Sequence, residues 1–191
     1  MNHSPYPVVL DACVLYPSLL RDLLMRLGIS GIYQPKWTVE INNEWQRNLL
    51  LNDSNLTAVK LQHIESLMNK ALPDANVTGY ETLIPGLDLP DIDDRHVLAA
   101  AIRSNSEVIV TANLKDFPAD KLSSFDIEAI HPDEFIADLF DLNSAMVLKV
   151  VQMARTSLKN PPFGVNDYLD ALQRQGLPMT VKALSAYQML L

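Results

Sequence analysis

Three carboxylates, Asp11, Glu44 and Asp94, lie in segments of this sequence that otherwise look buried. Asp11 directly follows the apolar run Val8–Leu10, and the other two lie within predicted helices. Two ionised carboxylates about 4 Å apart repel each other by roughly 4 kcal/mol at an effective dielectric of 20. Three acids gathered by folding would therefore need protons or a cation between them. Because ligands that offer only oxygen favour Mg²⁺ or Mn²⁺, the sequence predicts a site for a hard divalent ion if the three meet.

The predicted strand ends place Asp11 where functional groups usually collect. Open parallel sheets carry such groups beyond the carboxyl ends of their strands. Asp11 ends the strand predicted over 7–10, and polar side chains also follow the strand predicted over 107–111. These side chains are Thr111, Asn113 and Asp116. We expect both groups along one edge of the sheet, although Asp11 alone could equally be a helix cap or a turn residue.

Helical periodicity distinguishes Glu44 from its neighbour Glu40. The apolar stripe of the helix predicted over 37–51 is Trp37, Ile41, Trp45 and Leu49. At roughly 100° per residue, Glu44 lies about 20° outside this stripe and Glu40 lies farther from it. Glu40 is therefore expected on a solvated face with Arg47 nearby, and Glu44 at the margin of the buried face.

The segment LPDIDDRHVLAAAI shows a similar contrast among its acids. Asp91 and Asp93 need no functional explanation, because acids at a helix start bind free amides and oppose the helix dipole. Asp94 shares a helix face with the apolar residues that follow it and is expected to point toward the core. His96 lies off that face, so we expect it at the surface rather than as a metal ligand.

Composition sets the broad class of the protein. The 191 residues are 48% apolar and 20% charged, which is typical of a soluble chain with a core. No apolar run approaches the roughly 20 residues that span a bilayer, and the N-terminus lacks signal-peptide features. The single cysteine, Cys13, excludes an internal disulfide framework and a cysteine-rich zinc site, so a cytoplasmic location is expected. The net charge of −8, concentrated in residues 1–134, argues against indiscriminate nucleic-acid binding.

Strands and helices alternate along the first 140 residues. Strands are predicted over 7–10, 31–34, 107–111 and 126–130, and helices over 17–27, 37–51, 55–72, 92–104 and 132–141, with 76–82 either strand or loop. This order predicts an α/β fold whose mostly parallel sheet is covered on both faces. Only helical patterns follow, at 143–159, 165–175 and 179–190. We expect one domain over 1–140 and a helical C-terminal extension over 141–191.

Four ordered stretches resemble the PIN-domain ribonucleases, specifically the VapC-type toxins of bacterial toxin–antitoxin pairs. They are VVLDACVLYPSLLRDLL, WTVEINNEWQRNL, DIDDRHVLAAAI and VIVTANLKDF, and their order and spacing agree over about residues 7–135. The resemblance implies a Rossmann-like α/β/α fold and a Mg²⁺- or Mn²⁺-dependent endoribonuclease that leaves a 5′-phosphate and a 3′-hydroxyl. It also implies an RNA substrate, a small cognate antitoxin protein and a homodimer. The C-terminal extension resembles that of a larger VapC-like subgroup.

Carried over residue by residue, the resemblance implies that Asp11, Glu44, Asp94 and Asp116 are the catalytic metal ligands. Thr111 would form a hydrogen bond within the site. Asn113 departs from the family, because other members carry an aspartate at this position. The number of bound metal ions is therefore left open between one and two.

Basic side chains near the expected cleft are candidates for contacts with the RNA backbone, although each could equally be a solvated surface charge. They are Arg95, Lys115, Arg47 and Lys36. The helices of the extension have apolar faces that favour simple packing on the core, and a dimer contact, an antitoxin groove or an RNA-facing arm is left open. The scarcity of basic residues in LDALQRQGLPMTVKAL disfavours a DNA-binding helix–turn–helix.

Two other functions are compatible with parts of the sequence. A haloacid-dehalogenase-like phosphatase also begins with a strand-end aspartate, but its motif resembles D-x-D-x-T. Here Cys13 and Leu15 replace the second aspartate and the threonine. A catalytically inactive PIN-like scaffold that binds protein or RNA is supported by Asn113 and opposed by the intact acids.

Overall fold

A four-stranded parallel sheet forms the centre of the computed structural model, which describes residues 5–191. In chain order the strands are β1 (Pro7–Leu10), β2 (Gln34–Lys36), β3 (Val108–Val110) and β4 (Glu128–Ile130). Their spatial order is β2-β1-β3-β4, and all neighbouring pairs run parallel. After β1 the chain adds β2 on one side of the sheet, and after β3 it adds β4 on the opposite side. This makes the carboxyl ends of β1 and β3 a topological switch point, where open α/β sheets bind their ligands.

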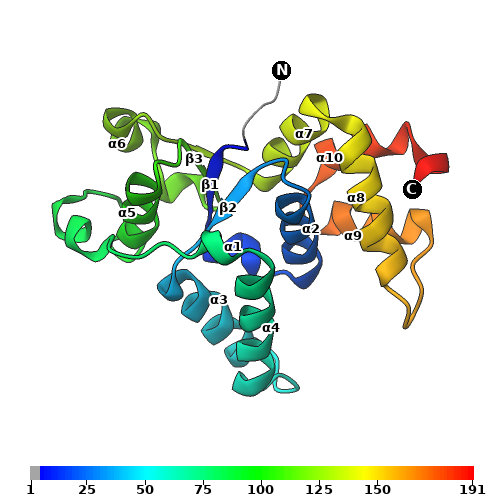
Figure 1. The fold of residues 1–191 in the computed structure, drawn as a ribbon, viewed down its shortest axis with the longest axis horizontal. Coiled ribbons are helices and arrows are strands. Elements are labelled where there is room, and N and C mark those ends of the chain that lie inside the picture. The colour runs from blue at the N-terminus through cyan, green and yellow to red at the C-terminus, as the bar shows by residue number, and fades with distance from the viewer. Residues whose placement is uncertain (1–4) are drawn as a thin grey trace.

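Helices cover both faces of the sheet, as Figure 1 shows. α5 (Arg95–Ser104) packs on β1, β2 and β3 from one side, and α2 (Ser18–Ile29) and α7 (Pro132–Leu142) lie on the other. The apolar run Val8–Leu10 is fully buried between these layers. The predicted α/β/α fold with a parallel sheet is confirmed.

Helix α5 is enclosed on more than one side. All residues from His96 to Ala101 are buried, and the three alanines in this run let the helix lie close to the sheet. The 3₁₀ helix η2 (Glu81–Gly86) packs against another side of α5. The predicted helix start at residue 92 was wrong. The preceding acids form a turn instead, in which the Asp93 amide donates to Asp91 Oδ1 at 2.9 Å.

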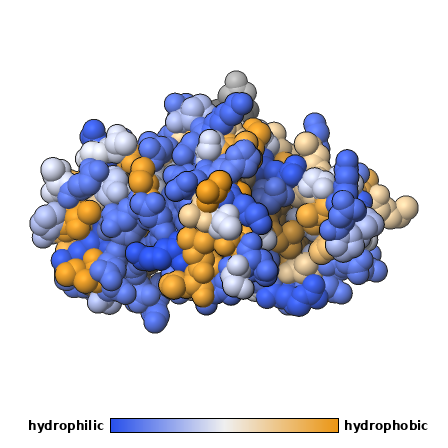
Figure 2. All heavy atoms as spheres, turned by 90° about the horizontal axis from the view of Figure 1, so that it is seen from below, coloured by the Kyte–Doolittle hydropathy of each residue, from blue (hydrophilic) through white to orange (hydrophobic). Residues whose placement is uncertain are grey.

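The helices α3 (Val39–Asn52) and α4 (Ala58–Ala71) form a hairpin at one end of the sheet. Each begins later than predicted, because a threonine caps it. Thr38 Oγ1 accepts from the Ile41 amide at 3.0 Å, and Thr57 Oγ1 accepts from the Lys60 amide at 3.3 Å. Leu51 and Val59, near the tip of the hairpin, have exposed apolar side chains. Figure 2, which views the molecule from the side of this hairpin, shows apolar patches between polar surface on that face.

Smaller differences from the predicted elements have local causes. Residues Ala12–Leu15 form the short helix α1, in a segment for which no helix or strand was predicted. β2 begins at Gln34 rather than at residue 31, because Gly31 turns the chain with a φ of 79° after α2. The ambiguous stretch 76–82 contributes a single bridge, between Trp37 and Asn76.

The C-terminal extension consists of α8 (Ser144–Ser157), α9 (Val165–Arg174), α10 (Pro178–Ser185) and the short 3₁₀ helix η5 (Gln188–Leu190). α8 packs on α2 and α7, and α10 packs on α7 and α9. The predicted helix over 179–190 was too long, since α10 ends at Ser185. Neither these helices nor any other in residues 5–191 has the length and apolar character needed to cross a membrane.

The buried carboxylate of Asp133 joins the extension to α7. Its side chain is only 4% exposed and accepts from the backbone amides of Met179 and Thr180, both at 2.8 Å. These amides lie in the first turn of α10, where helical backbone partners are missing. Asp133 therefore caps α10 from another helix.

Candidate functional site

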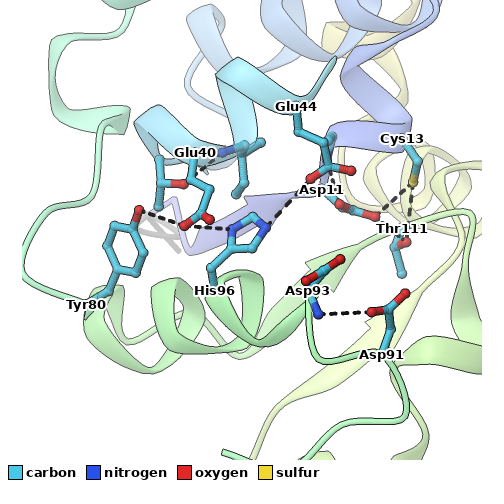
Figure 3. Close-up of polar contacts among 12 residues, drawn as sticks. Asp11, Cys13, Glu40, Glu44, Tyr80, Asp91, Asp93, His96 and Thr111 are labelled. Carbon is cyan, nitrogen blue, oxygen red and sulfur yellow. Dashed lines mark hydrogen bonds and ion pairs between the residues drawn. The ribbon is translucent and has the colours of Figure 1, made fainter. Parts of the chain in front are cut away.

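Asp11 lies at the switch point of the sheet and is almost completely buried, with 3% of its surface exposed. Its Oδ1 accepts from the Ala12 amide at 2.6 Å, so the residue does cap α1, one of the two structural roles expected for it. Its Oδ2 accepts from Thr111 Oγ1 at 2.7 Å and from Cys13 Sγ at 2.9 Å (Figure 3). Burial raises the pKa of Asp11 and the Glu44 carboxylate adds to this rise, although the hydrogen bonds from Cys13 and Thr111 oppose it.

Thr111 connects the ends of β1 and β3. It is fully buried, and besides donating to Asp11 its hydroxyl oxygen accepts from the Asn113 amide at 3.0 Å. Cys13 completes this group, since its sulfur accepts from the Ala112 amide at 3.2 Å. Burial, followed by the nearby Asp11 charge, raises the pKa of the Cys13 thiol to about 12, so it remains a neutral donor. The sequence analysis did not identify Cys13 as a hydrogen-bond partner of Asp11, because no local pattern indicates which side chain faces an acid at the end of a strand.

Asp94 occupies the N-cap position of α5 but makes no capping hydrogen bond with its side chain. Its half-buried carboxyl faces other acids. Burial is the largest cause, and together with the charges of Asp11, Asp91, Asp116 and Glu44, in that order, it raises the pKa of Asp94 to about 7. The acids predicted to meet therefore act on one another electrostatically in the folded chain.

A cavity of about 740 Å³ lies beside these acids. Carboxylates contribute much of its wall, and Arg47 and His96 are the basic side chains among the residues that line it. The lining carboxylates are Glu40, Glu44, Asp91, Asp93, Asp94 and Asp116. Asn113 also lines the cavity, so the position at which the family carries an aspartate faces the same space. Of the predicted ligands, Glu44, Asp94 and Asp116 line this cavity, and Asp11 influences Asp94 from the adjacent strand end.

The donor chemistry of this cavity fits a hard divalent cation. Carboxylate oxygens dominate, and without a cation between them the acids repel one another. Within residues 5–191, no three side chains of the histidine, cysteine, aspartate or glutamate type lie close enough together to share one metal ion. The acids therefore surround the space for an ion but do not form a closed ligand shell. This spacing is consistent with their mutual repulsion.

His96 lies inside the protein, so the prediction that it is a surface residue was wrong. It is 5% exposed, and its Nε2 lies 3.6 Å from Glu44 Oε2 while its Nδ1 lies 3.8 Å from Glu40 Oε2 (Figure 3). Burial lowers the pKa of His96, but the neighbouring Glu44 and Glu40 carboxylates outweigh burial and raise it overall. The periodicity argument failed because α5 is covered on a second side. The unbroken run HVLAAA was the sequence signal for such a helix.

The four candidate RNA-contacting cations differ in their surroundings. Arg47 lines the acidic cavity. Arg95 is mostly buried and lies 3.9 Å from Asp88, whereas Lys115 is exposed in the 3₁₀ helix Leu114–Asp116. Lys36 donates to the Asp74 carbonyl at 2.7 Å. Arg47 is thus the candidate that the fold places beside the acids.

Comparison with known proteins agrees with this architecture. Residues 7–115 match the family model described as "PIN domain", and residues 132–186 match the one described as "VapC50 C-terminal domain". A similar protein is "Putative ribonuclease VapC50" of Mycobacterium tuberculosis (strain ATCC 25618 / H37Rv), which is 42% identical over 112 residues. The alignment covers 59% of this chain and 66% of that relative, slightly less than two thirds of its length. No solved structure matches this chain significantly.

These matches cover both parts of the chain. The PIN match includes β1, β3 and the acids Asp11, Glu44 and Asp94, and it ends one residue before Asp116. The second match begins at the first residue of α7. The predicted domain boundary near residue 140 stays a prediction. The resemblance inferred from the four ordered stretches is confirmed. The chain belongs to the PIN-domain family, as a VapC-type member with a C-terminal helical extension.

Proposed function

We propose that this protein is a divalent-metal-dependent endoribonuclease and the toxin of a VapBC-type toxin–antitoxin pair. The observation that carries the proposal is the electrostatic coupling of Asp94 with Asp11, Asp116 and Glu44 beside one cavity at the switch point of the sheet. The name of the mycobacterial relative describes a ribonuclease, which supports the same activity.

In this proposal Asp11, Glu44, Asp94 and Asp116 hold Mg²⁺ or Mn²⁺. The chemistry supplied by the bound ion is activation of a water molecule for in-line attack on phosphorus and neutralisation of charge on the phosphate oxygens. Asp11 is held in a fixed orientation by the hydrogen bonds from Thr111 and Cys13. Asn113 would offer an amide to the site in place of a carboxylate, and this difference bears on whether one ion or two are bound.

The polyanionic substrate requires positive charge at the mouth of an acidic cavity. Arg47 is the first candidate for a contact with the RNA backbone, because it lines that cavity. Arg95, Lys115 and Lys36 are further candidates outside it. We further propose, from family membership, that a small cognate antitoxin neutralises the enzyme and that the protein forms a homodimer in the cytoplasm.

The variant Asp11→Asn tests the proposal directly. We expect the wild-type protein to cleave structured RNA with Mn²⁺ and to lose this activity in EDTA. Asp11→Asn should lower the cleavage rate at least about 100-fold, because it removes a negatively charged ligand while nearly preserving shape. Asp170→Asn, which changes an exposed acid of α9, is the matched control and should cleave at the wild-type rate. Undiminished cleavage by Asp11→Asn would refute the assignment.

A second candidate is a catalytically inactive PIN scaffold that binds protein or RNA. Asn113 favours it, because this amide lines the cavity where the family carries an acid. Titration of wild-type protein with millimolar Mn²⁺ in a calorimeter separates the two functions, since a scaffold would release or absorb no binding heat. The phosphatase alternative gains no support from the family matches.

A further inference from the structure

His96 is enclosed between two glutamates of another helix. The imidazole belongs to α5, and Glu40 and Glu44 lie one helical turn apart on α3. Nε2 of His96 lies 3.6 Å from Glu44 Oε2, and Nδ1 lies 3.8 Å from Glu40 Oε2. Because both neighbours accept hydrogen bonds, whichever ring nitrogen carries a hydrogen points toward a carboxylate.

The contacts extend beyond His96 to a tyrosine. The Tyr80 hydroxyl donates to Glu40 Oε2 at 3.5 Å, and Tyr80 is itself buried. Figure 3 shows the resulting line of side chains from Tyr80 through Glu40 and His96 to Glu44. The Tyr80 end lies outside the group formed by Asp11, Cys13 and Thr111, whereas the Glu44 end lies beside it. The line therefore leads from the periphery to a proposed metal ligand.

Packing alone does not explain a histidine at this position. The residues that follow it in α5 are apolar and fully buried, and His96 itself is only 5% exposed at the edge of the acidic cavity, so its imidazole carries a desolvation cost. Its Nδ1 lies beyond hydrogen-bond distance from any partner in residues 5–191. An apolar side chain at position 96 would avoid this desolvation cost. The contact between His96 and Glu44 therefore needs an explanation other than packing.

We propose that His96 is a positioning residue for Glu44, and this inference rests on the proposed function. The imidazole holds one carboxylate oxygen of Glu44, Oε2, from the α5 side, and the contact does not use Oε1. Glu40, which accepts from Tyr80, lies 3.8 Å from Nδ1 at the opposite edge of the imidazole and adds a negative charge there. Groups that orient a metal ligand in this way typically change metal affinity or activity by roughly 10- to 100-fold when they are removed.

The experiment compares His96→Leu with His96→Gln in the full-length protein. The leucine variant removes every polar contact at similar size, whereas glutamine keeps an N–H donor that can reach Glu44. We expect His96→Leu to raise the Mn²⁺ dissociation constant roughly 10- to 100-fold in calorimetry, with kcat lowered and the KM for RNA little changed. His96→Gln should recover most of the metal affinity. His63→Leu, at an exposed histidine of α4, is the control and should bind Mn²⁺ as the wild type does.

A wild-type Mn²⁺ affinity in His96→Leu would overturn the positioning role while leaving the proposed nuclease intact. Equal losses of Mn²⁺ affinity in His96→Leu and His96→Gln would also overturn it, because an N–H donor at position 96 would then have no effect on metal binding. Absence of Mn²⁺ binding by the wild type would instead overturn the proposed function together with this inference. Thermal unfolding of each variant accompanies the titration, so that affinities are compared between folded proteins.

The weaker contacts provide a graded second test. Glu40→Gln should raise the Mn²⁺ dissociation constant less than His96→Leu does, because Glu40 acts through the imidazole. Tyr80→Phe should have a smaller effect still, since it removes only a 3.5 Å contact to Glu40. A larger loss of Mn²⁺ affinity in Tyr80→Phe than in His96→Leu would contradict the proposal that Tyr80 acts on Glu44 only through Glu40 and His96.

Discussion

Two buried aspartates, Asp11 after β1 and Asp133 in α7, show how differently a fold can use the same side chain. Asp133 is 4% exposed and caps α10 through two backbone amides, whereas Asp11 is 3% exposed and lies near other acids. Backbone amides compensate the burial of Asp133. Asp11 receives an amide, a hydroxyl and a thiol, yet its pKa is still raised. Burial alone therefore does not indicate function. At Asp11 the indication is the nearby Glu44 carboxylate, which raises the pKa further although three hydrogen bonds stabilise the charged form.

Removal of the Asp133 carboxylate should give the largest loss of stability. Asp133→Ala leaves the amides of Met179 and Thr180 without a partner at a buried helix start, which should lower the free energy of unfolding by roughly 2–4 kcal/mol. Chemical denaturation measures this change. RNA cleavage per folded molecule should stay at the wild-type level, because the contact joins α7 to α10 and none of its residues lines the acidic cavity. A loss of cleavage by folded Asp133→Ala would show that the two aspartates are not functionally separate.

Stabilisation by added metal should depend on Asp11 and not on Asp133. Mn²⁺ at roughly 100 times its dissociation constant should stabilise the wild-type protein by about 2.7 kcal/mol, because it binds only the folded state. The same Mn²⁺ concentration should stabilise Asp133→Asn as much as the wild type and Asp11→Asn far less. Thermal unfolding with and without Mn²⁺ measures the difference. Equal metal-induced stabilisation of all three proteins would place the ion away from Asp11.

The contact between Thr111 and Asp11 should have the smallest of these effects. Thr111→Val removes the hydroxyl that donates to Asp11 Oδ2 at 2.7 Å and keeps the branched shape. Loss of one such hydrogen bond should lower the cleavage rate about tenfold, equivalent to roughly 1.4 kcal/mol. Thr111→Ser keeps the donor and should retain most activity in the same cleavage assay. If the valine and serine variants behave alike, the hydroxyl does not orient Asp11.

The amino-acid sequence by itself determined the parts of this protein that depend on neighbours along the chain. The strand before Asp11, the alternation of strands and helices, and the separation of Glu44 from the more exposed Glu40 all follow from local periodicity. The helix starts after Thr38 and Thr57 are also local, because side-chain oxygens cap them.

Only the tertiary structure decided which side chains meet across the chain. Thr111 reaches Asp11 because β3 pairs with β1, and His96 is buried beside Glu40 and Glu44 of α3, an element other than the sheet on which α5 packs. The spacing of apolar residues along a helix indicates the face that packs on one neighbouring element. It does not indicate whether a second element covers another face. The amide of Ala112 likewise reaches Cys13 Sγ because β3 lies beside β1. These contacts arise from packing between distant segments, which no local pattern specifies.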